Sequence, residues 1–221
     1  MKKMVIFGTG SLARLAYIHF SNENLYEVAA FTVNEKYLVD KKIFDLEVVP
    51  FEHIEKTHPS EAFSMFVAIG YRKANKARTQ IYHDCKTKGY ELVSCLGLKA
   101  NQMKYIKIGD NCLIMSNVII QPFVEIGNDI IIWDGSYIGY NSHIGDHSYI
   151  APSAVIAGNV EIGQYCFVGV NATIKDGITI APECVIGAGA VIIRDTEKGR
   201  VYRGQSAELL PYSSSELNYF K

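Results

Sequence analysis

A single spacing governs the hydrophobic positions in the second half of the chain. From residue 108 to residue 192, every sixth residue is isoleucine, apart from a valine at position 168. A period of six differs from the 3.6-residue period of an amphipathic helix. It is even, so it fits short strands whose alternate side chains point the same way. Because a fixed short period marks a repeat architecture, the pattern predicts stacked short strands over 108–192.

Small residues surround these aliphatic positions. The residue that follows is often glycine or alanine, as at Gly109, Gly127, Gly139, Ala157 and Gly163, which suits a tight turn with little room for a side chain. The pattern resembles the hexapeptide repeat of bacterial acyltransferases. That resemblance implies a left-handed parallel β-helix in which three hexapeptides form each triangular coil. Fifteen uninterrupted repeats then give five coils, a prism about 24 Å tall with no long inserted loop.

The first hundred residues follow a different pattern. Short apolar runs predict strands, and two longer stretches predict helices. The expected strands are Met4–Phe7, Glu27–Thr32, Glu47–Val49 and Met65–Ile69, and the expected helices run to about Ser21 and over about Asn75–Lys88. This order predicts a small α/β domain with a parallel sheet.

A glycine-rich turn joins the first strand to the first helix. Gly8-Thr9-Gly10-Ser11-Leu12-Ala13 has the form of a dinucleotide-binding fingerprint, in which glycines let the backbone approach a pyrophosphate at a helix N-terminus. A nicotinamide cofactor would need an acidic residue after the second strand, and Glu35 could serve. The domain lacks a second mononucleotide-binding half, which disfavours NAD. A tight turn without a ligand is the simpler alternative.

Composition narrows the classes of function. The formal net charge is −1, which favours neither nucleic acid nor an anionic membrane as a partner. No apolar run is long enough to cross a bilayer, and the N-terminus lacks the order of a secretory signal. The five cysteines have no CxxC spacing, and three lie on the inward phase of the repeat. We expect all five to be reduced, in a cytoplasmic protein.

The two halves together resemble one family. A truncated Rossmann-like domain followed by a hexapeptide prism is similar to the NeuD/PglD-like sugar O- and N-acyltransferases. The matching stretches are Ile6–Arg14, Val67–Arg78, Ile138–Gly163 and Val201–Ala207. The resemblance implies that the glycine-rich turn holds a nucleotide-linked sugar, that acetyl-CoA lies along the prism between subunits, and that the protein is a homotrimer acting in surface-glycan biosynthesis. We expect a nucleotide-sugar-binding domain over 1–103, the acyltransferase prism over 104–197 and a tail over 198–221.

The resemblance also implies roles for particular residues. The nucleotide sugar would meet the glycine-rich turn and the ends of two further strands: Gly8, Thr9, Gly10, Ser11, Leu12, Asn34, Glu35, Gly70, Tyr71 and Arg72. The cosubstrate acetyl-CoA would meet Ala157, Gly158, Lys175, Arg194 and Arg203. In the closing turn at 201–207, Ser206 replaces the proline of the family, so this turn should be less rigid.

The expected catalytic base is missing. Tyr140 stands where the family has a histidine, and a phenol is a poor base at neutral pH. Gly158, one coil further on, matches the glycine whose N–H stabilises the acyl oxygen. In one hypothesis His143 or His147 accepts the proton instead, from the cleft between subunits. In a second, the acceptor is an amine that loses its proton to water while Tyr140 orients it. In a third, the protein binds sugar nucleotides without catalysis.

The second hypothesis favours N-acetylation of an amino sugar, by direct attack on the thioester, over O-acetylation of the sialic acid type. A zinc enzyme of the same fold would need three histidine ligands, and only His143 and His147 lie on the repeat. A non-catalytic sensor or scaffold would bind the sugar nucleotide but not CoA. The identity of the sugar, the nucleotide and the acyl group does not follow from the sequence.

Overall fold

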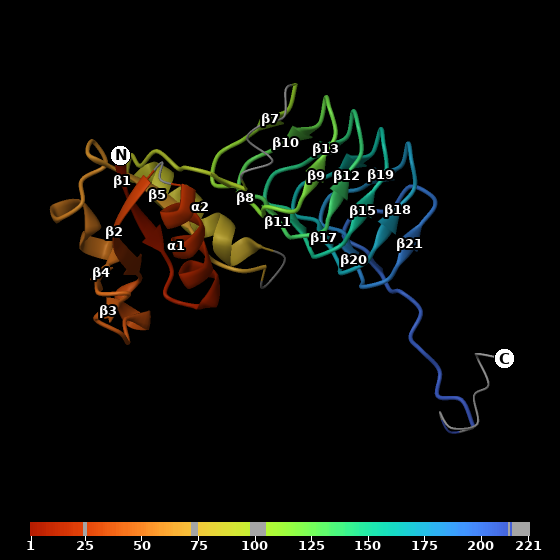
Figure 1. Cartoon of the computed structure of the whole chain (residues 1–221), viewed down its shortest axis with the longest axis horizontal. Coiled ribbons are helices and arrows are strands. Elements are labelled where there is room, and N and C mark those ends of the chain that lie inside the picture. The colour runs from red at the N-terminus through yellow and green to blue at the C-terminus, as the bar shows by residue number, and fades with distance from the viewer. Residues whose placement is uncertain (24–25, 72–74, 98–104, 212, 214–221) are drawn as a thin grey trace.

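The computed structural model describes residues 1–221 except 24–25, 72–74, 98–104, 212 and 214–221. An N-terminal α/β domain and a prism of stacked coils lie side by side (Figure 1). The N-terminal elements are β1 (Lys2–Phe7), α1 (Ser11–Glu23), β2 (Tyr26–Val33), β3 (Lys42–Ile43), β4 (Leu46–Pro50), β5 (Phe63–Val67) and α2 (Lys76–Thr87), with 3-10 helices at Glu35–Tyr37 and Phe51–Lys56.

The N-terminal sheet has the strand order β3-β4-β2-β1-β5. β1 pairs in parallel with β2 and β5, and β2 pairs in parallel with β4, while the short β3 is antiparallel to β4. The strands and helices expected from the sequence are present, and β3 and the 3-10 helices are additional. The carboxyl ends of β1, β2 and β5 meet at one sheet edge, where open α/β sheets bind their ligands.

The prism consists of two-residue strands joined by turns. They are β6 (Cys95–Leu96), β7 (Lys107–Ile108), β8 (Leu113–Ile114), β9 (Ile119–Ile120), β10 (Glu125–Ile126), β11 (Ile131–Ile132), β12 (Tyr137–Ile138), β13 (His143–Ile144), β14 (Tyr149–Ile150), β15 (Val155–Ile156), β16 (Glu161–Ile162), β17 (Phe167–Val168), β18 (Thr173–Ile174), β19 (Thr179–Ile180), β20 (Val185–Ile186), β21 (Val191–Ile192) and β22 (Val201–Tyr202).

These strands form three parallel faces, which we name by their terminal strands. The β7–β19 and β9–β21 faces have five strands each, and the β6–β22 face has seven. Within a face each strand up to β21 pairs with one 18 residues away, as Ile126 does with Ile144, whereas the closing strand β22 pairs with β20 at a separation of 16 residues, Val185 with Val201. The fold is therefore the expected left-handed β-helix. The β6–β22 face includes one strand before residue 104 and one after residue 197, the boundaries expected for the prism.

The sixfold aliphatic phase forms the core of the prism. Every residue of that phase is buried except Ile108, which is half-buried at the open end. The inward cysteines at 112, 166 and 184 are also fully buried. Burying a branched aliphatic side chain is worth about 1.5–3 kcal/mol, so a repeated core of this kind holds the coils in one register.

Two backbone positions recur along the repeat and shape its turns. Glycines directly after the core residue lie against the next coil: a Cβ at Gly139 would lie 2.4 Å from the carbonyl carbon of Ala157. The left-handed φ falls elsewhere, three residues before the core residue, as at Asn141 (φ 54°) and Asn159 (φ 54°). Asparagine tolerates this conformation better than most residues. The glycines therefore serve close packing between coils. The turn itself uses the left-handed position, which also holds residues such as Phe123, Tyr165 and Glu183.

The coils turn between faces at three edges. The Tyr140 edge (residues 140–141, 158–159 and 176–177) joins the β9–β21 face to the β7–β19 face. The His147 edge (residues 111, 129, 147, 165 and 183) joins the β7–β19 face to the β6–β22 face. Tyr140 and His147 thus belong to different edges of the triangle.

The N-terminal domain is fixed against the His147 edge. Arg78 of α2 donates through Nη2 to the carbonyl of Asn111 over 2.8 Å, and the Asn111 side chain accepts from the N–H of Val67 over 2.7 Å. Arg78 also forms a buried ion pair with Asp129, with 2.7 Å between Nε and Oδ1. These contacts hold the glycine-rich turn at a set position relative to the prism.

Neither helix of the described ranges has the length and apolar character needed to cross a bilayer. The part of the expected tail that lies at 212 and 214–221 falls outside the described residues.

Candidate active site

The glycine-rich turn forms one wall of a cavity at the carboxyl ends of the N-terminal strands. β1 ends at Phe7 and α1 begins at Ser11, and between them Gly8 adopts φ +124°. A Cβ on Gly8 would lie 2.8 Å from the carbonyl oxygen of Ala68 on the neighbouring chain segment. Only glycine fits here, because both the backbone angle and the space exclude a side chain. The turn thereby presents the N-terminus of a 13-residue helix to the cavity.

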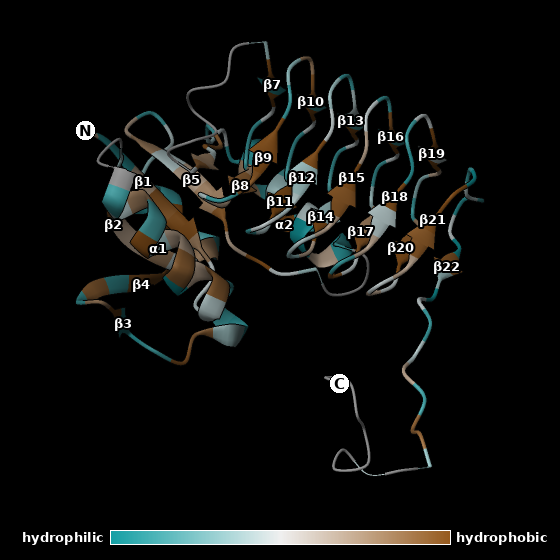
Figure 2. Ribbon diagram, turned by 45° about the vertical axis from the view of Figure 1, so that its right-hand side comes forward, coloured by the Kyte–Doolittle hydropathy of each residue, from teal (hydrophilic) through white to brown (hydrophobic). Residues whose placement is uncertain are grey.

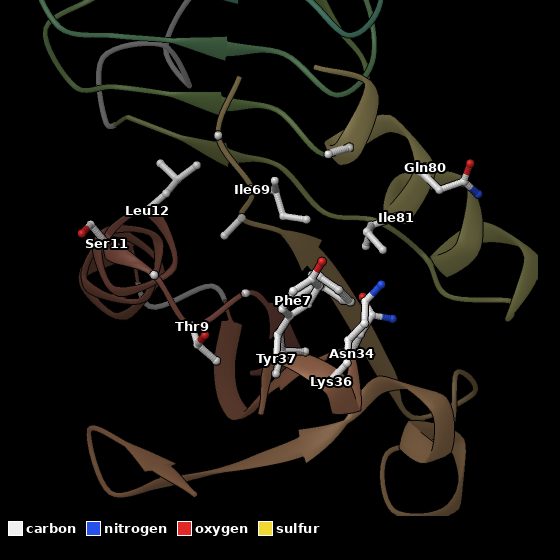
Figure 3. A pocket seen from close by; sticks show the side chains of 16 residues that line it. Phe7, Thr9, Ser11, Leu12, Asn34, Lys36, Tyr37, Ile69, Gln80 and Ile81 are labelled. Atoms are coloured by element: carbon white, nitrogen blue, oxygen red, sulfur yellow. The ribbon is translucent and has the colours of Figure 1, made fainter. Parts of the chain in front are cut away.

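The cavity has a volume of about 690 Å³, large enough for a small nucleotide-type ligand. Its lining contains seven of the residues expected to hold the nucleotide sugar: Gly8, Thr9, Gly10, Ser11, Leu12, Asn34 and Gly70. Figure 3 shows Thr9 and Ser11 on one side and Asn34, Lys36 and Tyr37 on another, with Gln80 and Ile81 contributed by α2. Lys36, Tyr37 and the α2 residues were not among the expected site residues. No sequence signal marks them, because they reach the cavity only through the packing of α2 and the 3-10 helix.

Glu35 does not line the cavity. Its backbone N–H donates to Oε2 of Glu52 over 2.9 Å, and Asn34 Nδ2 donates to the other Glu52 oxygen over 3.3 Å. Partial burial raises the pKa of Glu52, but these hydrogen bonds outweigh it, so the pKa is lowered. An ionised Glu52 therefore orients the segment that carries Asn34. Arg72 lies outside the described residues.

Tyr71 connects the glycine-rich turn to the prism. Its ring packs against Tyr149 and Phe167 of the β6–β22 face, with centroid distances of 4.9 and 4.8 Å. A second cavity of about 260 Å³ lies here, lined by Tyr71 and Tyr149 and by Ser11, Leu12 and Gly70 of the first cavity. The shared lining residues make the two cavities neighbours, so a ligand on the glycine-rich turn can extend towards the prism.

The Tyr140 edge carries the expected oxyanion donor. Tyr140 is half-exposed, and Gly158 lies beside it on the next coil. A Cβ at Gly158 would lie 2.7 Å from Cε1 of Tyr140 and 2.9 Å from a carboxylate oxygen of Asp176. In the described part of the chain the Gly158 N–H has no hydrogen-bond acceptor, while its carbonyl accepts from Gly177 over 3.0 Å. Gly158 itself is buried, so its N–H lies unpaired beneath the Tyr140 ring and the Asp176 carboxylate.

Asp176 is a residue that sequence reasoning missed. It stands 18 residues after Gly158 and 36 after Tyr140, so the same counting that placed Gly158 one coil beyond Tyr140 places Asp176 one coil further. Asn159 Nδ2 donates to the Tyr140 phenol oxygen over 3.3 Å and approaches Oδ2 of Asp176 at 3.4 Å. The three side chains form one polar cluster above Gly158.

His143 lies on a charged face. It projects outward from β13, and its Nδ1 is 2.5 Å from Oε1 of Glu161. One coil below, Glu125 pairs with Lys107 at 2.5 Å. His143 is therefore near the Tyr140 edge along the chain, but its ring is engaged by a carboxylate on the β7–β19 face.

His147 is buried, contrary to the expectation that it points into a cleft. Only 5% of the residue is exposed, and its Nδ1 lies 2.9 Å from Oδ2 of Asp129, the partner of Arg78. Its ring stacks on Tyr165 with centroids 4.9 Å apart. The burial arises because α2 covers the His147 edge, a contact between segments far apart in sequence.

The expected CoA residues are divided between two edges. Ala157, Gly158, Lys175 and Arg194 follow one another up the Tyr140 edge, and Lys175 and Arg194 are exposed. Arg203 follows β22, which pairs with β20 on the β6–β22 face, so it lies at the third edge. Within one chain, Arg203 is therefore not beside the other four.

Comparison with known proteins agrees with this architecture. Residues 105–140, 141–176 and 159–194 match the family described as bacterial transferase hexapeptide (six repeats). No curated protein sequence matches the chain. Among solved structures, perosamine N-acetyltransferase from Caulobacter crescentus in complex with CoA and GDP-perosamine is 25% identical, with a TM-score of 0.80 over 91% of this chain and 94% of that one.

A histidine-to-asparagine variant of the same Caulobacter enzyme has a TM-score of 0.82 at 25% identity, over 91% of this chain and 93% of that one. The acetyltransferase domain of PglB from Neisseria gonorrhoeae, in complex with acetyl coenzyme A, has a TM-score of 0.80 at 20% identity, over 95% and 99% of the two chains. These matches extend over both domains. They confirm the fold expected from the sequence and the resemblance to sugar acyltransferases.

Proposed function

We propose that this chain, an acyltransferase of the left-handed β-helix, hexapeptide-repeat type, transfers the acetyl group of acetyl-CoA to the amine of a nucleotide-linked amino sugar. The observation that carries the proposal is the joint match of both domains to an N-acetyltransferase crystallised with CoA and GDP-perosamine. The hexapeptide prism alone would indicate only an acyltransferase. The glycine-rich cavity attached to it supports a nucleotide-linked acceptor.

The nucleotide is proposed to occupy the larger cavity. Gly8 and Gly10 bring the backbone close to the ligand, and the N-terminus of α1 favours the negative charge of a diphosphate. Lys36 lines the same cavity and adds a cation. The sugar would then extend past Gly70 and Tyr71 over the β6–β22 face. Because the Tyr140 edge lies opposite this face within one chain, the sugar would meet the Tyr140 edge of a neighbouring subunit in the proposed trimer.

The acetyl donor is proposed to lie along the Tyr140 edge. Lys175 and Arg194 are exposed cations on successive coils of this edge, and such side chains bind phosphate groups. The sugar amine attacks the thioester carbon, the carbon–sulfur bond breaks, and CoA leaves as the thiol. The unoccupied N–H of Gly158 would donate to the oxygen that becomes negative during attack.

The protein is proposed to act as a homotrimer in the cytoplasm, where acetyl-CoA and nucleotide sugars are made. The three prism faces differ in their outward residues. The β7–β19 face is charged, the β6–β22 face is partly covered by the N-terminal domain, and the β9–β21 face exposes Ile119, Val155 and Val191, which are 50%, 41% and 66% exposed. Figure 2 shows hydrophobic colour on β9, β15 and β21. A second copy of the chain is the partner that we propose for this face.

The test is an assay of purified protein with acetyl-CoA and a panel of acceptors. We expect mass spectrometry to show one added acetyl group on at least one GDP-, UDP- or dTDP-linked amino sugar, with release of free CoA thiol. Matched sugars with a hydroxyl in place of the amine should react far more slowly. Turnover of hydroxyl sugars alone would contradict N-acetylation, and binding of sugar nucleotides without any CoA binding would indicate a non-catalytic protein.

A further inference from the structure

The polar cluster of Tyr140, Asn159 and Asp176 on the Tyr140 edge contains a carboxylate, Asp176, that the hexapeptide repeat does not require. Asp176 is an exposed carboxylate at a turn, and no lysine, arginine or histidine of the described residues forms an ion pair with it. Its Oδ2 accepts a hydrogen bond from Asn159 Nδ2 over 3.4 Å. Glu125 and Asp129 of the prism pair with Lys107 and Arg78, whereas Asp176, like Asp134 and Asp195, accepts a hydrogen bond from an uncharged N–H group. Asp176 is therefore free to meet a cation from outside the chain.

The surroundings place this carboxylate beside Gly158, the expected oxyanion donor. Gly158 lies between the Tyr140 ring and the Asp176 carboxylate, and both would be within 3 Å of a Cβ at that position. The Gly158 N–H has no acceptor in the described part of the chain. The Gly158 N–H and the Asp176 carboxylate therefore lie close together. The N–H could donate to an oxygen that gains negative charge during the reaction, and the carboxylate could accept from a nitrogen that gains positive charge.

On the basis of the proposed function, we infer that Asp176 is the acceptor-binding residue that contacts the sugar amine and receives its proton. The neutral amine nitrogen attacks the thioester carbon, which gives the nitrogen a positive charge and the oxygen a negative one. Asp176 stabilises the first charge and the Gly158 N–H the second. A proton passes from nitrogen to the carboxylate, the carbon–sulfur bond breaks, and the proton is returned to the CoA sulfur, leaving the amide and the thiol.

This assignment accounts for the lack of a free histidine at the site. His147 is buried on another edge, and His143 is held by Glu161. A carboxylate is a weak base, which suits an amine because attack makes its N–H strongly acidic. A hydroxyl would need a stronger base to assist attack. Tyr140 and Asn159, which are hydrogen-bonded to each other at 3.3 Å, would keep the acceptor pocket in shape.

The test is the Asp176→Asn substitution in the full-length protein, assayed with acetyl-CoA and the amino-sugar nucleotide that the wild type acetylates best, beginning with GDP-perosamine. Loss of a charge-assisted hydrogen bond should lower kcat/KM for the amine roughly 10- to 100-fold. The KM for acetyl-CoA and the melting temperature should stay at wild-type values. Asp176→Glu, which keeps the charge, should recover part of the rate.

The matched control is Asp134→Asn. Asp134 occupies the same position of its hexapeptide at a different edge of the prism, and its substitution should leave kcat/KM unchanged. Wild-type kcat/KM in Asp176→Asn, or an equal loss in both variants, would overturn the inference. If the wild type acetylates no amino-sugar nucleotide at all, the proposed function itself fails, and this outcome is distinct from either of the others.

Discussion

At the scale of single residues, Gly8 and Gly10 of the glycine-rich turn are required for different reasons. Gly8 has both a left-handed φ of +124° and a neighbour only 2.8 Å from where its Cβ would lie. Gly10 lies in the same turn with nothing within 4 Å of a Cβ. The backbone conformation and the close neighbour require a glycine at position 8. Position 10 is open towards the cavity, so a side chain there would meet the ligand rather than the protein. Substituting them separately distinguishes folding from ligand binding.

We expect Gly8→Ala to lower the free energy of unfolding by about 1–3 kcal/mol, because alanine is strained at this backbone angle, and to abolish nucleotide-sugar binding. Gly10→Ala should keep the wild-type stability but weaken binding, since its methyl group obstructs the approach of a diphosphate. Chemical denaturation and calorimetric titration with a nucleotide sugar measure the two effects. Equal stability of the two variants would contradict the strain at Gly8.

At the scale of elements, α2 is the part that ties the two domains together. Arg78 is 1% exposed and lies between α2 and the His147 edge, where Asp129 also accepts from Asn111 Nδ2 over 2.6 Å and lies 2.9 Å from His147. In this cluster the charged side chains of Arg78 and Asp129 pair with each other, and Asp129 also contacts Asn111 and His147. Such a network fixes the position of a helix more than it adds stability.

Arg78→Met is expected to lower the free energy of unfolding by about 3–5 kcal/mol, because it leaves the Asp129 carboxylate buried without its cation. The double variant Arg78→Met with Asp129→Leu should regain part of the loss. Arg14→Met serves as the control, since Arg14 forms a half-exposed pair with Asp40 at 3.8 Å that is worth no more than about 1 kcal/mol. Urea denaturation of the four proteins measures these values; similar losses for Arg78→Met and Arg14→Met would exclude a buried network.

At the scale of the whole molecule, the three faces of the prism have different neighbours. The β7–β19 face is exposed to solvent, the β6–β22 face contacts the N-terminal domain, and the β9–β21 face is proposed to contact a second copy of the chain. The outward row of the β7–β19 face includes Lys107, Glu125, His143 and Glu161. The β9–β21 face instead carries exposed aliphatic residues. Both faces have the same inward aliphatic core, so the fold does not require their outward residues to differ. Exposed aliphatic residues on the β9–β21 face are instead what an interface between subunits would need.

Val155→Asp should convert a trimer into smaller species, because a charge buried in an apolar interface costs several kcal/mol. Light scattering after size-exclusion chromatography would give a mass near three times the 24.6 kDa chain for the wild type and a lower mass for the variant. Val155→Thr, which is close in shape and uncharged, should keep the wild-type mass. A monomeric wild type would refute the proposed assembly.

The sequence by itself determined the fold, because a strict sixfold phase of isoleucine and a strand–glycine turn–helix order are local patterns that admit few architectures. It also located Tyr140 and Gly158 on one edge, since the 18-residue coil makes position along the chain equivalent to position in space. The burial of His147 required the tertiary structure, because it depends on the packing of α2 (Lys76–Thr87), which lies 60 to 71 residues earlier in the chain. The same holds for Lys36 and Gln80 in the cavity, and for the lack of an ion pair at Asp176 within the described part of the chain. These are contacts between distant segments, which no local period encodes.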